Sequence, residues 1–236
     1  AAITATAAAL LKSGDHILSN RCLYGETIEL FDFLFGKFGV ETTYVDMADL
    51  NAIREAVRPD TIIVATGADP IVPKIPGIDR TNCMYATDVY YKPEKVGHKI
   101  AVIGGGLVGC EVGLHLAKTG HEVEVVEMLD GLARDDQAIH KSGMMALWNE
   151  LPISAHLNTK VLEVLENGLR CENAQGETFI VGADPVVYCI GLRANQSVYE
   201  EMRQLCHDTI CIGDCTTSGR IVDAVHDGWN AAIDIA

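Results

Sequence analysis

The sequence predicts an α/β protein in which parallel strands alternate with helices. Short apolar runs typical of buried strands alternate along the chain with segments whose apolar residues recur at helical spacing. A glycine-rich turn joins one such run to a helix. A composition of 48% apolar and 22% charged residues suits a globular core. Because alternating strands and helices favour right-handed parallel crossovers, we expect Rossmann-like parallel sheets.

The first 67 residues contain three expected strands. Residues 1–12 are rich in Ala and Leu and favour a helix, which SGDH interrupts. From Glu26 apolar residues fall at helical spacing until Gly36 and Gly39. The remaining expected elements are a strand at 16–18, a strand at 40–46, a helix at 47–57 that begins near Asp46 or Asp49, and an apolar strand at 61–67.

Residues 68–95 hold four of the seven prolines and are expected to form an extended crossing segment, because proline disfavours a helix interior. After them the pattern of strands and helices resumes. The expected elements are a strand at 99–103, a helix at 111–120, a strand at 121–127, a helix at 144–151, a hairpin or meander at 158–180 with turns at Asn167-Gly168 and Gln175-Gly176, a strand at 185–191, and a strand, turn and helix within 209–236.

Charge and composition exclude several classes of partner. The net charge is −15 and lysines and arginines do not cluster, which argues against binding nucleic acid or an anionic membrane. No apolar run approaches the roughly 20 residues of a spanning helix, and the start lacks a basic region typical of a signal peptide. We therefore expect a cytoplasmic protein with no membrane span, and we leave its oligomeric state open.

The eight cysteines are scattered without a CxxC pair, so most are expected to be buried thiols. Cys211 and Cys215 flank a Gly-Asp turn, and a metal or disulfide role for them is the alternative. No metal site is predicted, since no second pair has ligand spacing. Four histidines lack partners at the spacing of a nucleophile or a metal site: His140, His156, His207 and His226. They are expected at the surface or next to residues that contact a ligand, without contacting it themselves.

Residues 104–109 match the dinucleotide-binding pattern GxGxxG. Its members are Gly104, Gly105, Gly106, Leu107, Val108 and Gly109. The motif follows a strand and opens a helix, and the next strand ends on Glu127, about 20 residues on, as a dinucleotide site requires. The first glycine permits the tight turn, the second lets backbone approach a pyrophosphate, and the third lets helix and strand pack closely.

The same pattern bears on which cofactor would bind. A carboxylate at Glu127 accepts hydrogen bonds from ribose hydroxyls and repels a 2′-phosphate, so NAD is expected rather than NADP. Arg134 lies near enough in sequence to keep NADP open. The alternative is a glycine turn that holds no ligand.

Four ordered motifs, the glycine turn together with TIIVATGADPIVPKIPG, PVVYCIGLRAN and TICIGDC, resemble the flavoprotein reductases with two dinucleotide-binding domains. Residues 61–236 are most similar to the reductase part of 2,4-dienoyl-CoA reductase, enoate reductase and trimethylamine dehydrogenase, which are NADH:flavin oxidoreductases of the pyridine nucleotide-disulfide oxidoreductase superfamily. The resemblance implies an NAD(P) domain inserted into an FAD domain. The barrel and iron–sulfur cysteines of the longer members are not found.

That resemblance also implies site residues. The ATG strand (Ala65, Thr66, Gly67) and the Gly213-Asp214 turn would belong to the FAD half, with Asp214 bonding the flavin's ribityl chain. A helix N-terminus near Asp223 and Ala224 would approach the isoalloxazine ring. Gly191 would lie at the edge of the NAD site, and Glu111 matches an acidic position after the glycine turn. Residues 1–60 contain no second GxGxxG motif.

Residues 1–61 instead resemble an early segment of the pyridoxal-phosphate enzymes of Cys/Met metabolism, such as methionine γ-lyase and O-acetylhomoserine sulfhydrylase. By this resemblance Tyr24 in LYGET would stack on the pyridoxal ring, and the alternative is a half-buried packing tyrosine. The family's Schiff-base lysine would follow residue 61, where the resemblance changes, so covalent capture of the cofactor is not expected. The two resemblances together suggest a chimera joined near Thr61.

Four parts are therefore predicted. Residues 1–61 would complete the first sheet, 62–95 would supply an FAD-type strand and a linker, 96–195 the NAD(P)-binding domain, and 196–236 the return to the FAD-type domain. The first functional hypothesis is an NAD(H)-binding module that transfers hydride between nicotinamide and a flavin. The second is a non-catalytic chimeric or truncated dinucleotide-binding domain, and the third is a fragment of a pyridoxal-phosphate lyase. No side chain qualifies as a catalytic acid, base or nucleophile.

Overall fold

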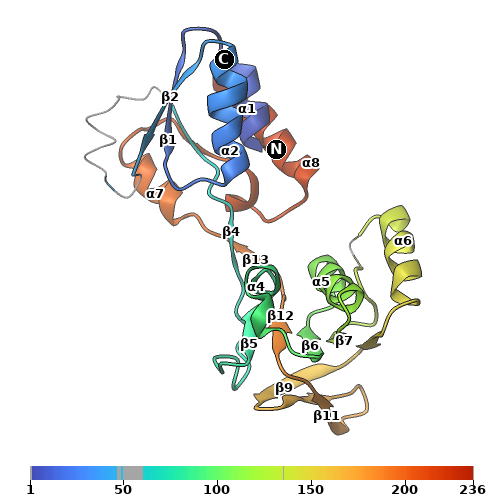
Figure 1. Ribbon diagram of the computed structural model, residues 1–236. Coiled ribbons are helices and arrows are strands. Elements are labelled where there is room, and N and C mark those ends of the chain that lie inside the picture. Colours follow the sequence, from blue (N-terminus) through green and yellow to red (C-terminus); the bar gives the residue numbers. More distant parts are fainter. Residues whose placement is uncertain (1, 47–48, 50–60, 135, 236) are drawn as a thin grey trace. The chain divides into compact units, whose positions relative to one another are not determined.

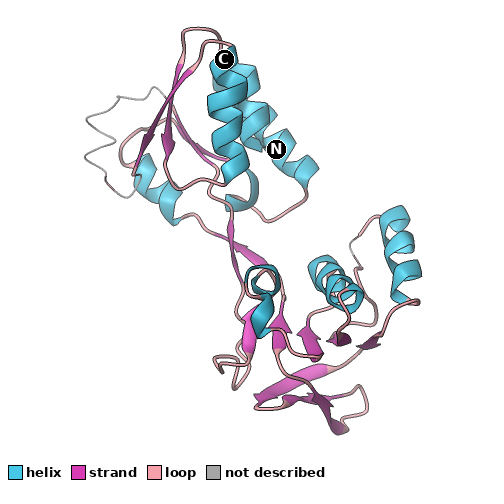
Figure 2. Ribbon diagram, in the orientation of Figure 1, coloured by secondary structure: helices cyan, strands magenta, loops and turns pink. Residues whose placement is uncertain are grey.

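The chain forms two compact units in a computed structural model that describes residues 2–46, 49, 61–134 and 136–235 (Figure 1). The first unit combines Ala1–Asp69 with Arg193–Ala236, and the second is Pro70–Leu192. The second unit is thus an insertion between two segments of the first. Both units contain helices and strands, as Figure 2 shows.

A five-stranded parallel sheet forms the centre of the second unit, in the order β5-β12-β6-β7-β8. Strand β6 therefore lies between β7 on one side and β12 on the other. The bounds are β5 (Cys83–Tyr85), β6 (Lys99–Ile103), β7 (Glu122–Val126), β8 (Ile153–His156) and β12 (Val186–Tyr188).

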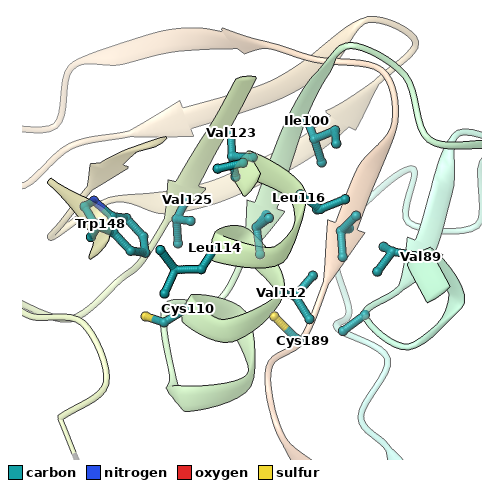
Figure 3. Packing of buried hydrophobic residues seen from close by; sticks show 14 of the residues in the cluster. Val89, Ile100, Cys110, Val112, Leu114, Leu116, Val123, Val125, Trp148 and Cys189 are labelled. Atoms are coloured by element: carbon teal, nitrogen blue, oxygen red, sulfur yellow. The ribbon is translucent and has the colours of Figure 1, made fainter. Parts of the chain in front are cut away.

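Alternate side chains of these strands enter two separate cores. On β6, Ile100 and Val102 pack with helix residues, whereas Ala101 and Ile103 pack with an antiparallel meander. Figure 3 shows the helix-side core, which α5 and Trp148 of α6 help to form. The elements concerned are α4 (Asp88–Tyr91), a 3₁₀ turn η2 (Pro93–Lys95), α5 (Leu107–Lys118), α6 (Ala138–Trp148), and the meander β9 (Lys160–Leu165), β10 (Gly168–Glu172) and β11 (Thr178–Gly182).

The first unit contains two parallel strand pairs, β1 with β2 and β3 with β14. Leu18, Val45 and Val64 contribute from three of these strands to one core cluster, together with Met202 of α7. The bounds are α1 (Ala2–Leu10), β1 (His16–Asn20), α2 (Gly25–Glu29), a π-helix η1 (Leu30–Phe35), β2 (Glu41–Val45), β3 (Ile62–Val64), α7 (Ser197–Arg203), β14 (Thr209–Cys211), a 3₁₀ turn η3 (Gly213–Cys215) and α8 (Ile221–Ile235).

Helices α1 and α8, from opposite ends of the chain, pack closely. A Cβ on Gly228 would lie 2.6 Å from the carbonyl oxygen of Ala2, so only glycine allows this approach. The Thr6 hydroxyl donates a hydrogen bond to the Gly228 carbonyl at 3.1 Å. The N-terminal helix is therefore an integral part of the first unit.

The expected elements outside 47–57 are present, and that expected helix lies outside the described residues. Helices α5 and α6 begin earlier than expected. The segment 68–95 carries β4 (Ala68–Pro70), β5 and α4, and β4 pairs with β13 (Leu192–Ala194). Because β5 pairs with β12, this segment groups with the inserted unit from Pro70 onward, before the boundary expected at residue 96.

Two further elements have no counterpart in the expectations. Strand β8 has four residues and α7 has seven, and segments this short display no clear apolar period. Throughout the described part of the chain, each helix is too short or too polar to cross a membrane.

Candidate functional site

The glycine turn follows β6, where the strand order reverses. Strand β6 pairs with β7 on one side and with β12 on the other. The chain therefore adds β7 on one side of β6 and later adds β12 on the opposite side. In open α/β sheets, ligands bind beyond the carboxyl ends of the strands at such a switch point. Gly104 after β6, Glu127 after β7 and Gly191 shortly after β12 all follow strand ends at this edge.

Glycine is required at three positions of the turn. Gly104 has φ +106°, and a Cβ there would lie 2.5 Å from the Cys189 carbonyl oxygen. A Cβ on Gly105 would lie 2.9 Å from the Cβ of Glu127, and one on Gly109 would collide with the carbonyl oxygen of Gly104. These contacts hold α5 against the sheet and fix the path of the turn.

Gly106 differs because the space around it is open. It is the N-cap of α5, no side-chain hydrogen bond caps the helix, and a Cβ there would meet no described atom within 4 Å. The next residues, Leu107 and Val108, are 37% and 45% exposed. The free N–H groups of this helix end therefore face open space, where an anion is favoured by the helix dipole.

Glu127 is buried beside the turn with only 8% of its surface exposed. Its Oε2 accepts a hydrogen bond from the Gly105 N–H at 2.6 Å, and its Oε1 accepts one from the Leu129 N–H at 2.8 Å. The carboxylate thus clamps the turn to the end of β7. Since each carboxylate oxygen has a second lone pair, a ribose hydroxyl can still donate to it.

Two buried thiols support the turn from the core side, a role that sequence reasoning missed. Cys189 donates to the carbonyl oxygen of Gly104 at 3.5 Å, and Cys110 donates to that of Gly105 at 3.4 Å. Burial raises the pKa of Cys110 to about 11 and that of Cys189 to about 12, so both remain protonated donors at neutral pH. The feature of the sequence that could have indicated this role is their position, because Cys110 directly follows Gly109 and Cys189 directly follows β12.

Other predicted residues of the NAD site have distinct surroundings. Glu111 lines a groove of about 530 Å³ between α5 and α6, together with His115 and Lys118. Arg134 is paired with Asp130 at 3.0 Å (Nη1 to Oδ1) on the surface. Gly191 has φ +119° and its carbonyl accepts a hydrogen bond from the Ile71 N–H at 3.0 Å.

The first unit has a pocket of about 300 Å³ where most residues predicted for the FAD half meet. Ala65, Gly67, Gly213, Asp214 and Ala224 all line it, whereas Thr66 does not. Sequence reasoning missed the other lining residues, which come from α1, from the segment before α8 and from the first residue of α8: Ala2, Ile3, Ile212, Gly219, Arg220 and Ile221.

Hydrogen bonds to carboxylates shape this pocket. Gly213, at φ +70°, donates its N–H to Oδ2 of Asp227 at 3.0 Å. Oδ1 of Asp214 accepts from the Gly219 N–H at 3.0 Å. The Asp223 carboxylate accepts from the Arg220 N–H at 2.8 Å, just before α8 begins. A carboxylate acceptor beside a helix N-terminus fits a polyhydroxyl chain.

The remaining candidates lie apart from both sites. Tyr24 is the N-cap residue of α2 and is 75% exposed, so the alternative of a half-buried packing tyrosine is wrong. His140, His156 and His207 pair with neighbouring carboxylates. All eight cysteines are thiols, and the described residues contain no group of three potential metal ligands.

Known proteins match this chain over most of its length. A family model described as pyridine nucleotide-disulphide oxidoreductase matches residues 15–224. An NADH oxidase from Thermoanaerobacter brockii is 36% identical over 209 residues, which are 84% of this chain and 31% of the oxidase. The structure of 2-naphthoyl-CoA reductase in complex with 2-naphthoyl-CoA superposes with a TM-score of 0.82 at 23% identity, over 98% of this chain and 38% of that one.

A shorter match has a different source. An O-succinylhomoserine sulfhydrylase from Pseudomonas aeruginosa is 43% identical over 60 residues, which are 25% of this chain and 15% of that enzyme. The likeness to enzymes of Cys/Met metabolism is thus a short partial one, whereas the oxidoreductase model extends from residue 15 across position 61. The chain belongs to the pyridine nucleotide-disulphide oxidoreductase family.

Proposed function

We propose that this chain is an NAD(H)-binding module of a flavoprotein reductase. The chain spans 31% of the length of the NADH oxidase it matches, so the activity of a whole reductase is part of the proposal. The observation that carries it is the open N-terminus of α5 at the switch point of the five-stranded sheet. There Gly106 leaves space for a pyrophosphate, and the turn residues around it are fixed by contacts that tolerate no side chain.

Glu127 supports NAD over NADP in this proposal. Its buried carboxylate keeps free lone pairs for ribose hydroxyls and would face a 2′-phosphate with an uncompensated negative charge. Arg134 is already paired with Asp130, which reduces its availability to such a phosphate. The chain's own part is to bind the dinucleotide and fix its orientation.

For the first unit we propose contact with a flavin. When bound, nicotinamide supplies a hydride and the flavin accepts it, so the redox chemistry belongs to the cofactors. Asp214 would accept hydrogen bonds from the ribityl hydroxyls, and the N-terminal end of α8 would stabilise negative charge on the ring. The four-part domain division and a cytoplasmic location, in keeping with eight thiols, also remain proposals.

The second candidate is a dinucleotide-binding domain without turnover. It is favoured by the lack of a second GxGxxG motif in residues 1–60. A junction near Thr61 with a pyridoxal-phosphate enzyme is supported by the 60-residue sulfhydrylase match. A family model that runs through position 61 favours one continuous domain instead.

A visible spectrum of the purified protein separates these candidates. The reductase proposal expects a flavin spectrum that NADH bleaches without oxygen, and Asp214→Ala should lose the flavin while NADH still binds. The matched control is Asp234→Ala at the other, exposed end of α8, which should leave both unchanged. A colourless protein that still binds NADH supports the second candidate. Failure to bind NADH at all would contradict both.

A further inference from the structure

The first two N–H groups of the glycine turn already have acceptors within the second unit. The Gly104 N–H donates to the Val126 carbonyl oxygen at 2.9 Å. The Gly105 N–H donates to Oε2 of Glu127 at 2.6 Å. Among the described residues, none accepts a hydrogen bond from the Gly106 N–H. The Gly106 N–H is therefore the first donor of the turn that is available to a ligand.

The Gly105 carbonyl is held by two donors from buried residues. The Ala133 N–H donates to its oxygen at 2.8 Å, and the Cys110 thiol donates at 3.4 Å. The peptide bond between Gly105 and Gly106 is trans, so its C=O and its N–H point in opposite directions. Because the C=O points at Ala133 and Cys110, the Gly106 N–H points away from both of them.

Ala133 makes this bond in a backbone conformation that is unusual for alanine. It lies between β7 and α6 with φ +42°, in the left-handed region that favours glycine. Its methyl group packs in the helix-side core, and only 1% of the residue is exposed. A strained backbone of this kind persists where the surrounding structure enforces it, and such residues cluster at ligand sites. Burial of the methyl group and the bond to Gly105 enforce it here.

We propose that Ala133 is a positioning residue for the dinucleotide, because its N–H orients the peptide group that presents the Gly106 N–H to a pyrophosphate oxygen. This role rests on the proposed function and assigns one donor of the same site. Without the bond from Ala133, the peptide group is free to rotate and to present the Gly105 oxygen, which repels a phosphate. A donor that is already oriented spares the ligand the cost of ordering it.

The proposed role of Ala133 concerns the phosphates of the ligand and not its ribose. Glu127 is the expected partner of the ribose hydroxyls, whereas the Gly106 N–H is the expected partner of the pyrophosphate. ADP-ribose and adenosine share the adenine-linked ribose, but only ADP-ribose carries a pyrophosphate. Comparing these two ligands therefore separates the orientation of the Gly106 N–H from general damage to the turn.

Substitutions at Ala133 in the full chain test this role. Ala133→Val adds a branched side chain at a buried position with positive φ, so the backbone should shift and the N–H should lose its acceptor. Titration calorimetry should then show a loss of about 10-fold in affinity for ADP-ribose and less than about a twofold change for adenosine. Ala133→Gly permits the same φ and keeps the N–H, so both affinities should be retained. Ala174→Val, at the exposed turn between β10 and β11, is the matched control and should change neither affinity.

A second measurement uses the unchanged protein and decides alone should Ala133→Val fail to fold. In NMR spectra with assigned amide signals, ADP-ribose should shift the Gly106 amide proton downfield, because that proton would enter a hydrogen bond to a phosphate oxygen. Adenosine should leave this signal in place. The Gly105 amide proton, which is already bonded to Glu127, should move little with either ligand and is the internal control.

Three results would overturn the role of Ala133 alone. The first is that Ala133→Val weakens both ligands equally or weakens neither. The second is that Ala133→Gly loses as much affinity for ADP-ribose as Ala133→Val does. The third is that ADP-ribose binds the unchanged protein without moving the Gly106 signal. If the unchanged protein binds neither ADP-ribose nor NADH, the proposed function is wrong, and the role of Ala133 is wrong with it.

Discussion

The glycine turn of the second unit and the pocket of the first unit are built in different ways. The turn is one run of six residues whose backbone groups face the expected ligand, and Glu127 closes it from the next strand. The pocket is assembled from three segments, one near Ala2, one near Ala65 and one from Ile212 to Ala224. A site made by consecutive residues depends on local geometry, whereas an assembled site depends on strand pairing and helix packing.

The supporting interactions differ as well. The turn is held by protonated thiols and a clamping carboxylate inside a sheet core. The pocket is held by carboxylates that accept from backbone N–H groups of Gly213 and Gly219. We therefore expect the turn to be sensitive to added side-chain volume and the pocket to be sensitive to loss of a carboxylate.

The largest effect is expected from Gly109→Ala. Its Cβ would collide with the Gly104 carbonyl, forcing α5 from the sheet at a cost of about 1–3 kcal/mol. Affinity for NADH should fall by roughly 100-fold, as isothermal titration would measure. Gly143→Ala in α6 is the control, because its Cβ meets no described atom within 4 Å and should stabilise the helix by about 0.5–1 kcal/mol. Equal behaviour of the two variants would contradict a turn that excludes side chains.

A smaller loss of NADH affinity is expected from Glu127→Ala, which separates two roles of this carboxylate. Loss of the clamp leaves the N–H groups of Gly105 and Leu129 unpaired, costing about 1–3 kcal/mol of unfolding free energy each if they stay buried. Loss of the ribose contact should weaken NADH more than NADPH, measured by fluorescence titration. Glu166→Ala, at an exposed position, should change neither. If Glu127→Ala weakens the binding of NADH and NADPH equally, Glu127 holds the turn but makes no contact with the ribose.

The smallest effect is expected at Glu124, on the meander face of the second unit. Burial alone would raise its pKa, but hydrogen bonds from Lys99 and His156 outweigh it and hold the pKa below its ordinary 4.5. The lowered pKa means that its stabilisation is complete above pH 4.5 and is lost as the pH falls through the folded-state value.

In Glu124→Gln, the free energy of unfolding should depend less steeply on pH below 4.5. The resulting difference in that free energy should be under about 1 kcal/mol, because solvent screens the partly exposed ion pair. Urea unfolding at a series of pH values measures this. Lys99→Gln should reproduce part of the change, since it removes the first of the two bonds. If the pH dependence of the free energy of unfolding below pH 4.5 is unchanged in both variants, the bonds of Glu124 to Lys99 and His156 contribute nothing to the stability of the second unit.

Local patterns were sufficient for the turn and for most elements. The motif of residues 104–109, the strand before it and the acid at Glu127 are spaced by the geometry of one strand-helix-strand unit, which sequence distance describes directly. The thiol of Cys189 was not identified as a support, because its contact with the turn depends on β12 pairing with β6 and joins residues 85 positions apart in the sequence. The thiol of Cys110 is only five residues from its partner Gly105, but which backbone group it contacts depends on the path of the turn. The short elements β8 and α7 lacked enough residues to display a period.

The sequence by itself determined the parallel α/β class, the position of the glycine turn and the acid that follows it, because each depends on backbone preferences over a few residues. Only the tertiary structure decided that α1 borders the pocket with Ala65, Gly213 and Ala224. Those contacts arise where β3 pairs with β14 and α1 packs on α8 through Gly228. Pairings between distant segments are selected by the burial of whole faces, which no short stretch of sequence specifies.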